Sequence, residues 1–335
     1  MHRRDLIVIG TSMGGLDTLR RLLAQLPADL AAGIVIVQHT SPHRESLLAG
    51  LLNRAGSPLL VTEGTDGEEI LNGHVYLAPA DHHILISGRY LRVGRGPREN
   101  RSRPAIDPLF RTAACAGRGR TIGIVLTGLL DDGAAGLAAI KLCGGVTIVQ
   151  DPKDAEHSSM PQQAMRACAP DYVVALAQMG SLLSKLIQES RPAPPPVPED
   201  IALEANMTLR ALDFPDLGNI HDTAKLGNLS PYTCPDCGGS LWQMGEEERY
   251  RCHVGHAHSL TSLVSGQDEN LERALWAAVR SLEERQKTFE RLADNDEKRG
   301  QGTSNYRERA GESKVYARRI RETLLAFSKK WAPAL

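Results

Sequence analysis

The segment most informative about the architecture is Asp5-Leu6-Ile7-Val8-Ile9-Gly10-Thr11-Ser12-Met13-Gly14-Gly15-Leu16-Asp17-Thr18-Leu19-Arg20-Arg21-Leu22-Leu23. Its first five residues are typical of a short buried β-strand, and residues 16–23 carry apolar side chains at helical spacing. Between them, residues 10–14 fit the pattern G-x-S-x-G. A tight, glycine-flanked turn from a strand into a helix exposes one side chain at the carboxyl edge of a sheet. The sequence therefore predicts that the hydroxyl of Ser12 is a nucleophile.

A glycine-rich turn after the first strand also binds pyrophosphate in dinucleotide-binding folds. Here the order G-x-S-x-G-G departs from G-x-G-x-x-G. The next predicted strand, residues 33–39, ends in His39 where a ribose-binding Asp or Glu is expected. We therefore disfavour a nicotinamide or flavin site. A turn of the same shape without a catalytic role is the other alternative.

Residues 5 to about 180 alternate strand-like and helix-like patterns. Further strands are predicted at 59–61, 74–78, 83–86, 90–93, 121–126, 145–149 and 172–174, and helices at 44–52, 108–116, 134–141 and 161–167. Continuous Val and Ile runs separated by helices predict an α/β fold with a doubly wound, mostly parallel sheet and helices on both faces. Residues 74–93 contain no helical pattern and are expected to form a hairpin.

The composition excludes several classes of function. The chain has 335 residues and a formal net charge of −1, which gives no electrostatic reason to expect nucleic acid or an anionic membrane. It contains no run of eighteen apolar residues and enters a strand within five residues, so neither membrane insertion nor a secretory signal is predicted. Three isolated cysteines, Cys115, Cys143 and Cys168, are expected to be buried thiols in a reducing cytoplasm.

Two polar residues follow predicted strands and complete a catalytic constellation with Ser12. His39 ends the second strand, and Asp132 comes after the strand at 121–126. The carboxyl ends of parallel strands line one crevice, so these side chains are expected to converge. A serine hydroxyl needs an imidazole to remove its proton, and the imidazole needs a carboxylate to fix its tautomer. Taken singly, a histidine more often bonds a backbone carbonyl, and Asp131 or Asp132 would cap a helix.

The second half of the chain has a different organisation. Residues 191–198 (RPAPPPVP) predict an extended polyproline linker. We expect a catalytic domain over 1–188, a Pro-rich and irregular linker over 189–229, a small zinc-ribbon-like module over 230–262 and a C-terminal helical hairpin over 263–335.

The small module contains a cluster with the spacing of metal ligands. It consists of Cys234, Cys237, Cys252 and His256. Three thiolates and one imidazole at this spacing predict one structural zinc ion with no open coordination position. A redox Cys-x-x-Cys motif is the alternative, but it leaves the second half of the cluster unexplained. His253 and His258 are rival fourth ligands.

The tail predicts two amphipathic helices joined by a glycine-containing loop at 298–302. Their apolar stripes are Leu271, Leu275, Ala278, Leu282, Phe289 and Leu292, then Tyr306, Ala310, Ala317, Ile320, Leu324, Phe327 and Trp331. Such a pair predicts an antiparallel hairpin. Because two helices have little core of their own, we expect them to pack on the catalytic domain, on a second copy or on a partner. In residues 268–330, 15 Lys and Arg alternate with 12 Asp and Glu, which disfavours nucleic-acid binding.

Six blocks of the first half, taken together and in order, resemble the chemotaxis protein-glutamate methylesterase family (CheB). They are residues 9–15 (IGTSMGG), 37–39 (VQH), 66–68 with 75–79 (DGE, VYLAP), 103–110 (RPAIDPLF), 126–136 (LTGLLDDGAAG), and 150–151 with 160–161 (QD, MP). The resemblance implies a serine esterase that hydrolyses glutamate methyl esters on chemoreceptor helices, releases methanol and needs no cofactor for catalysis. Members of the family also deamidate receptor glutamines.

Carried over by position, the resemblance implies that Ser12 is the nucleophile, His39 the base and Asp132 the orienting carboxylate, with Asp131 as second choice. The backbone N–H groups of Met13 and Leu129 are candidate oxyanion donors. Two departures from the family's usual sequence concern these same loops. Met13 replaces a threonine, and residues 128–130 (GLL) replace Gly-Met-Gly.

The family usually carries an N-terminal receiver domain, and four residues before the first strand leave no room for one. The chain therefore resembles an orphan member with a cysteine-rich extension. The expected partner is a methylated chemoreceptor or a related helical signalling protein, and the C-terminal helices suggest a homo-oligomer. The alternative function is a non-catalytic adaptor that keeps the hydrolase fold and binds a signalling partner through its zinc and helical modules.

Overall fold

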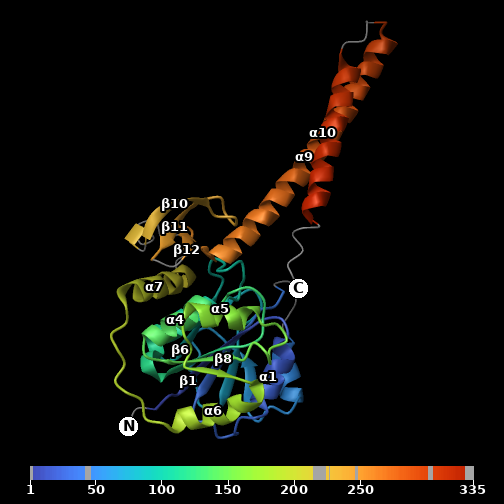
Figure 1. Cartoon of the computed structure of the whole chain (residues 1–335). Helices are drawn as coiled ribbons and strands as arrows, with labels where there is room; N and C mark the ends of the chain where they lie inside the picture. The colour runs from blue at the N-terminus through green and yellow to red at the C-terminus, as the bar shows by residue number, and fades with distance from the viewer. Residues whose placement is uncertain are drawn as a thin grey trace. The chain divides into compact units, whose positions relative to one another are not determined.

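The computed structural model describes residues 3–41, 47–213, 224–225, 227–245, 248–300 and 305–328. The contacts within the chain divide it into a unit of Met1–Leu263 and a helical unit of Val264–Leu335. The first unit contains a large sheet domain together with a small antiparallel sheet. Figure 1 shows the labelled elements of both units.

The large sheet has seven parallel strands in the order β3-β4-β2-β1-β7-β8-β9. They are β1 (Leu6–Thr11), β2 (Gly33–Gln38), β3 (Leu60–Glu63), β4 (His74–Leu77), β7 (Thr121–Val125), β8 (Val146–Gln150) and β9 (Tyr172–Val174). The chain moves outward from β1 through β2 and later returns to the other side of β1 with β7. The strand order therefore reverses beside β1, which is where ligands bind in open α/β sheets.

Helices cover both faces of this sheet, and the strands supply apolar side chains to both (Figure 1). One face carries α1 (Gly15–Leu23), α2 (Leu48–Arg54) and α6 (Leu176–Gln188), and the other carries α3 (Ile106–Gly117), α4 (Ala134–Leu142) and α5 (Ser159–Ala167). In β1, Ile7 and Ile9 belong to the first core, whereas Leu6 and Val8 belong to the second. A strand that is buried on both faces reads as a continuous apolar run, and this is why the sequence predicted the doubly wound α/β fold correctly.

One of the sequence predictions needs correction within this domain. Residues 74–93 do not form one hairpin, because β4 lies inside the parallel sheet between β2 and β3. Only β5 (His83–Ser87) and β6 (Tyr90–Gly94) pair as an antiparallel hairpin. β4 is nearly fully buried and joins the core of the large sheet. The absence of a helical pattern in residues 74–93 does not show which sheet a strand joins. The helix predicted at 44–52 begins at Leu48, and residues 42–46 lie outside the described part of the chain.

The stretch expected to be an irregular linker, 189–229, contains a helix, α7 (Glu199–Asp213). Its buried face includes Ile201 and Met207 but also the polar residues Glu204 and Thr208. α7 packs against α3, and Ile201 joins the second core. The polar residues interrupt the apolar periodicity, so the sequence pattern did not indicate a helix.

The small antiparallel sheet has the strand order β10-β11-β12-β13. Its strands are β10 (Gly227–Thr233), β11 (Ser240–Met244), β12 (Arg249–Cys252) and β13 (Ala257–Ser259). Its core is a cluster of five buried residues: Cys234, Leu241, Tyr250, Cys252 and Leu263. A core of this size stabilises a domain weakly without an additional cross-link such as a metal ion.

The helical unit is built from α9 (Leu260–Lys298) and α10 (Tyr306–Ser328). The rings of Phe289 and Tyr306 stack with centroids 6.0 Å apart, and Arg321 pairs with Glu283 at 2.6 Å between Nη2 and Oε1. Residues further along α10 thus contact residues nearer the start of α9, so the two helices are antiparallel. The predicted stripe residue Trp331 lies outside the described residues.

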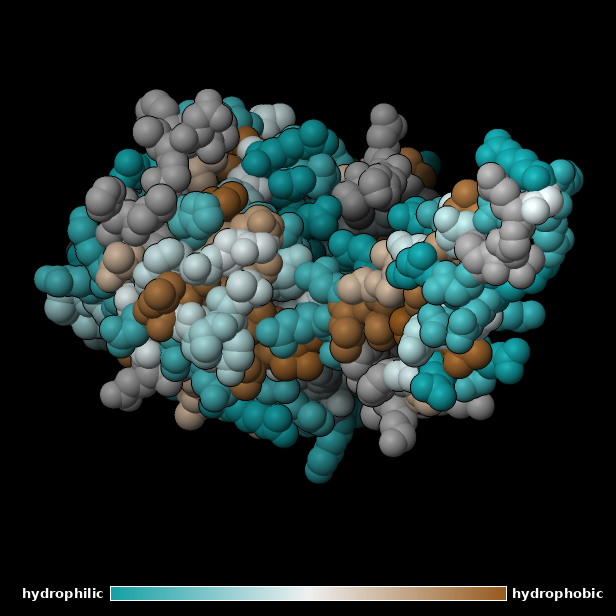
Figure 2. Space-filling model, turned by 90° about the horizontal axis from the view of Figure 1, so that it is seen from above, coloured by the Kyte–Doolittle hydropathy of each residue, from teal (hydrophilic) through white to brown (hydrophobic). Residues whose placement is uncertain are grey.

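Within the described ranges, no helix has both the length and the apolar character of a membrane span. On the face drawn in Figure 2, hydrophobic residues lie in patches among hydrophilic ones.

Replacing a central core residue tests this architecture. Ile9→Ala removes a side chain that is 0 % exposed in β1 and is expected to lower the free energy of unfolding by about 2–5 kcal/mol. Leu60→Ala, on the edge strand β3 where Leu60 is 54 % exposed, is expected to change it by about 0.5 kcal/mol. Urea unfolding followed by circular dichroism measures both, and equal losses would contradict the assignment of β1 to the centre.

Candidate active site and metal cluster

Ser12 lies on the turn between β1 and α1, at the carboxyl edge of the large sheet. Its backbone N–H donates to the carbonyl of Thr127 at 3.0 Å, which fixes the turn to the loop after β7. The glycines are required by geometry: Gly14 has φ 78°, and a Cβ on Gly10 would lie 2.3 Å from Cγ2 of Ile106. The turn therefore leaves the Ser12 side chain half-buried at the surface of the sheet.

His39 directly follows β2, the strand beside β1. Its Nδ1 lies 3.2 Å from Oγ of Ser12, and its Nε2 lies 2.7 Å from Oδ2 of Asp132. Both distances are within hydrogen-bond reach. In the neutral tautomer that this network favours, Nε2–H donates to the carboxylate and Nδ1 accepts the serine proton.

Asp132 is the carboxylate that contacts the histidine, and it is 3 % exposed. Besides His39, it accepts hydrogen bonds from the backbone N–H of Ile106 at 2.7 Å and from Nδ2 of Asn100 at 3.0 Å. Burial by itself raises the pKa of Asp132, but the hydrogen bonds and the charge of His39 outweigh it, so the pKa lies below its usual value. The second choice, Asp131, lies beside Ser259 and Thr261 instead, and burial raises its pKa.

The predicted oxyanion donors, Met13 and Leu129, flank the serine. Ser12 and Gly128 use their own N–H groups within the protein, on the carbonyls of Thr127 and His157. In the described part of the chain, the N–H groups of Met13 and Leu129 donate to no other protein group. Both are therefore available to a substrate oxygen.

A cleft of about 700 Å³ opens beside Ser12 and His39. Met13, Leu16 and Leu51 line it, and their side chains are 53 %, 43 % and 42 % exposed. Apolar side chains that are exposed around a polar centre are typical of a binding site.

Sequence reasoning missed Asn100, and it quoted Asp107 only as part of a motif. Asp107 accepts hydrogen bonds from the N–H groups of Gly133 and Gly136 at 3.1 and 2.6 Å, so it caps α4 immediately after the loop that carries Asp132. Burial and the neighbouring Asp132 raise the pKa of Asp107 to about 7. Nδ2 of Asn100 donates to both carboxylates, at 2.8 Å to Asp107 and 3.0 Å to Asp132. No periodicity or spacing in the sequence marks an asparagine for this role.

The structure also brings the predicted metal ligands together. One ligand atom each from Cys234, Cys237, Cys252 and His256 lies within 4.8 Å of the others. Sγ of Cys237 and Sγ of Cys252 are 3.7 Å apart, which is too far for a disulfide. Two thiolates about 2.3 Å from a tetrahedral zinc ion lie about 3.8 Å apart, so this cluster has the dimensions of a zinc site.

The two rival histidines lie differently around this cluster. Nε2 of His258 is 3.5 Å from Sγ of Cys234, and His258, Cys234 and Asp236 form a second possible group of ligands. His253 belongs to neither group among the described residues. The geometry thus agrees with His256 as fourth ligand and leaves His258 as its rival.

Comparison with known proteins places this fold and site in a family. The sequence model of the CheB methylesterase family matches residues 7–183, more than half of the chain. The chain therefore belongs to the CheB methylesterase family, and the resemblance found in its motifs is confirmed.

Individual relatives cover the same region. A provisionally named protein-glutamate methylesterase/protein-glutamine glutaminase of Leptospira interrogans is 38 % identical over 187 residues, which is 56 % of this chain and 96 % of that protein. Protein-glutamate methylesterase/protein-glutamine glutaminase 2 of Xanthomonas oryzae is 39 % identical over 190 residues, and the match spans about half (52 %) of its length. The crystal structure of the Thermotoga maritima CheB methylesterase catalytic domain superposes with a TM-score of 0.52 at 33 % identity, covering 55 % of this chain and 98 % of that one.

Two glycines with the same backbone conformation test the serine turn. Gly14 has φ 78° and a Cβ there would lie 2.7 Å from Oε2 of Glu156, whereas Gly67 has φ 79° and open space around it. Both Gly14→Ala and Gly67→Ala are expected to lower the free energy of unfolding by about 1–2 kcal/mol because of the left-handed backbone. Only Gly14→Ala is expected to shift the amide NMR signals of Ser12 and His39. Shifts of those signals in Gly67→Ala would contradict this.

Proposed function

We propose that this chain is a serine hydrolase that removes the methyl esters of glutamyl side chains in a chemoreceptor-like protein and releases methanol. The observation that supports it most directly is the hydrogen-bonded series Ser12–His39–Asp132 at the mouth of an open cleft. Membership of the CheB methylesterase family supports the reaction type. Because relatives are named for glutaminase activity as well, deamidation of glutaminyl side chains is proposed as a second reaction of the same site.

In the proposed reaction, Oγ of Ser12 attacks the ester carbonyl while Nδ1 of His39 accepts its proton. Asp132 accepts the hydrogen bond of Nε2–H and stabilises the imidazolium. The N–H groups of Met13 and Leu129 would bind the oxyanion of the tetrahedral intermediate. His39 then returns the proton to the departing methoxide, which leaves as methanol. Water, activated by the same imidazole, hydrolyses the acyl-enzyme to free glutamate and restores Ser12.

The proposed partner is a helical protein surface that carries the modified glutamate. The exposed side chains of Met13, Leu16 and Leu51 around the cleft would contact apolar residues next to that glutamate. A helix presents residues three and four positions apart on one face, which suits a shallow apolar rim around one reactive centre.

We also propose a structural zinc ion held by Cys234, Cys237, Cys252 and His256. The soft donor set and the 3.7 Å separation of two sulfurs support it. The ion would cross-link the small sheet and take no part in ester hydrolysis. A cytoplasmic location agrees with six cysteines that form no disulfide with one another. A homo-oligomer through the C-terminal helices remains a proposal, supported by exposed apolar side chains such as Leu271, Trp276 and Leu325.

Methanol release from methylated receptor preparations tests the activity. The unchanged chain is expected to release methanol, and Ser12→Ala is expected to release none because the acyl-enzyme cannot form. Both proteins should have the same circular dichroism spectrum. If neither protein releases methanol although both are folded, the esterase proposal is wrong and the adaptor function is favoured.

The choice between the two neighbouring acids is tested by paired substitutions. Asp132→Asn is expected to lower kcat by about 10⁴-fold, since an amide cannot hold the imidazole in the required tautomer. Asp131→Asn, which does not contact His39, is expected to leave kcat within about threefold. Methanol release measures both, and a larger loss in Asp131→Asn would refute the assignment of the acid.

The metal site is tested by the zinc content of the purified chain. One zinc per chain is expected, and Cys234→Ser should lose it and unfold the small sheet. Cys168→Ser, which changes a cysteine outside the cluster, should keep its zinc. Zinc that persists unchanged in Cys234→Ser would contradict the ligand assignment.

A further inference from the structure

The loop before α3 has an unusual backbone at the point where it meets the catalytic acid. Asn100 and Arg101 have φ of 48° and 65°, in the left-handed region that residues other than glycine rarely adopt. Such a conformation persists only when its surroundings hold it. The surroundings here come from the small antiparallel sheet as well as from the domain that carries Asp132.

Strand β13 of that sheet holds this loop through its backbone. The N–H of Asn100 donates to the carbonyl of Ala257 at 2.8 Å, and the N–H of Ala257 donates to the carbonyl of Arg98 at 3.3 Å. The N–H of Ser259 donates to Oδ1 of the Asn100 side chain at 3.0 Å. β13 thus fixes both the backbone and the amide orientation of Asn100.

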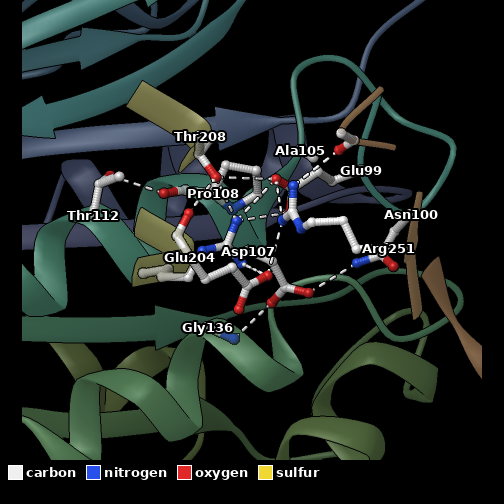
Figure 3. Close-up of polar contacts among 12 residues, drawn as sticks. Glu99, Asn100, Ala105, Asp107, Pro108, Thr112, Gly136, Glu204, Thr208 and Arg251 are labelled. Carbon is white, nitrogen blue, oxygen red and sulfur yellow. Dashed lines mark hydrogen bonds and ion pairs between the residues drawn. The ribbon is translucent and has the colours of Figure 1, made fainter. Parts of the chain in front are cut away.

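The other end of the same amide reaches the catalytic residues. Nδ2 of Asn100 carries two hydrogens, and it donates to Oδ2 of Asp107 and to Oδ1 of Asp132, as Figure 3 shows for Asp107. The carbonyl oxygen faces β13 and the amino group faces the carboxylates, so a flipped amide would break every one of these bonds. Oδ1 of Asp132 also accepts the backbone N–H of Asp107 at 3.1 Å, so Asn100 supplies the side-chain donor of the two that orient this oxygen, while Oδ2 contacts His39.

A buried ion cluster clamps the neighbouring residue, Glu99, to the same sheet (Figure 3). Nη2 of Arg251, in β12, lies 2.8 Å from Oε1 of Glu99 and 2.8 Å from Oε1 of Glu204. Nη1 of Arg251 also donates to the carbonyl of Gly255, in the turn between two predicted zinc ligands. Arg251 and Glu99 are each 2 % exposed, and a buried pair of this kind is costly to separate.

Metal ligands lie immediately beside these contacts. His256 precedes Ala257 in the chain, and the N–H of Cys252 donates to the carbonyl of His256 at 2.9 Å. Two of the five core residues of the small sheet are themselves proposed ligands, Cys234 and Cys252. Without a metal ion, we expect this small core to hold β13 less firmly, even with the buried Arg251–Glu99 pair in place.

We propose that the metal-bound small sheet positions the catalytic acid: β13 holds Asn100, and Asn100 holds the Asp132 carboxylate against His39. Asn100 is then a positioning residue. The triad supplies no ligand to the metal ion, but binding of the metal ion determines whether the triad is arranged for reaction. This inference rests on the proposed hydrolase function and on the proposed zinc site. It gives the C-terminal extension a direct role in the chemistry of the first domain.

The test compares Asn100→Gly with metal removal in the full chain. Glycine keeps the left-handed backbone and deletes only the amide, so the loop is preserved. The readout is the second-order rate constant for labelling of Ser12 by a fluorophosphonate, measured in both proteins with zinc bound and after chelation. Either change alone is expected to lower the rate by about 10–100-fold, as expected for a misplacement of about 1 Å. Chelation of Asn100→Gly should lower it no further, because both changes act on one contact.

A matched control is Arg118→Gly, which makes the same change at another left-handed position (φ 51°) at the far end of α3. Its labelling rate should equal that of the unchanged chain. The proton NMR signal of the His39–Asp132 hydrogen bond gives a second readout, and it should weaken on chelation and in Asn100→Gly. If Asn100→Gly does not fold, Ser262→Ala removes a hydroxyl 3.3 Å from Oδ1 of Asn100 and should lower the rate several-fold.

Several outcomes would overturn the inference. A chelated chain that has lost its zinc yet labels within twofold of the loaded chain excludes metal-dependent positioning. Effects of chelation and of Asn100→Gly that multiply would show that they act through different contacts. If the loaded chain is not labelled at all, the hydrolase proposal fails instead, and the NMR signal alone then decides whether the small sheet positions Asp132.

Discussion

The hydrogen bonds around the buried carboxylate of Asp132 join three distant parts of the chain at one point. A carboxylate that is 3 % exposed needs donors on both oxygens, because an unpaired buried charge is costly. Those donors come from the end of β2, the start of α3 and the loop at residue 100. The sheet and α3 therefore meet at one side chain, and the small module reaches it through Asn100.

The parallel sheet explains how residues so distant in sequence reach that point. β1 lies between β2 and β7, so the loops after these three strands share one edge. Ser12, His39 and Asp132 each belong to one of these loops. The reversal of strand order beside β1 opens a space at that edge, where parallel α/β sheets commonly bind their ligands.

The small sheet also contacts the domain that carries this carboxylate. In the first unit, the small sheet contacts the catalytic domain through β13, through Arg251 and through α7, which carries Glu204. Three arginines, Arg111, Arg249 and Arg251, surround Glu99 and Glu204. Burial by itself raises the pKa of Glu99, but Arg111 and Arg251 outweigh it and lower that pKa to about 2, so the glutamate stays charged at neutral pH. Such a cluster fixes the geometry of docking more than it adds stability.

The sequence by itself determined the α/β class, the strand-turn-helix around Ser12, the family and the spacing of the cysteine cluster. These features are local or periodic. Buried strands and tight turns require particular residue types at particular spacings, so they can be recognised in the sequence. The tertiary structure alone decided that β4 lies inside the sheet, that Glu199–Asp213 is a helix and that Asn100 touches Asp132. Glu204 and Thr208 are polar residues on the buried face of α7, and their hydrogen-bond partners lie in other elements, so the apolar pattern of the helix is broken there. Asn100 has no recognisable sequence pattern, because its contacts form only when β13 lies beside it.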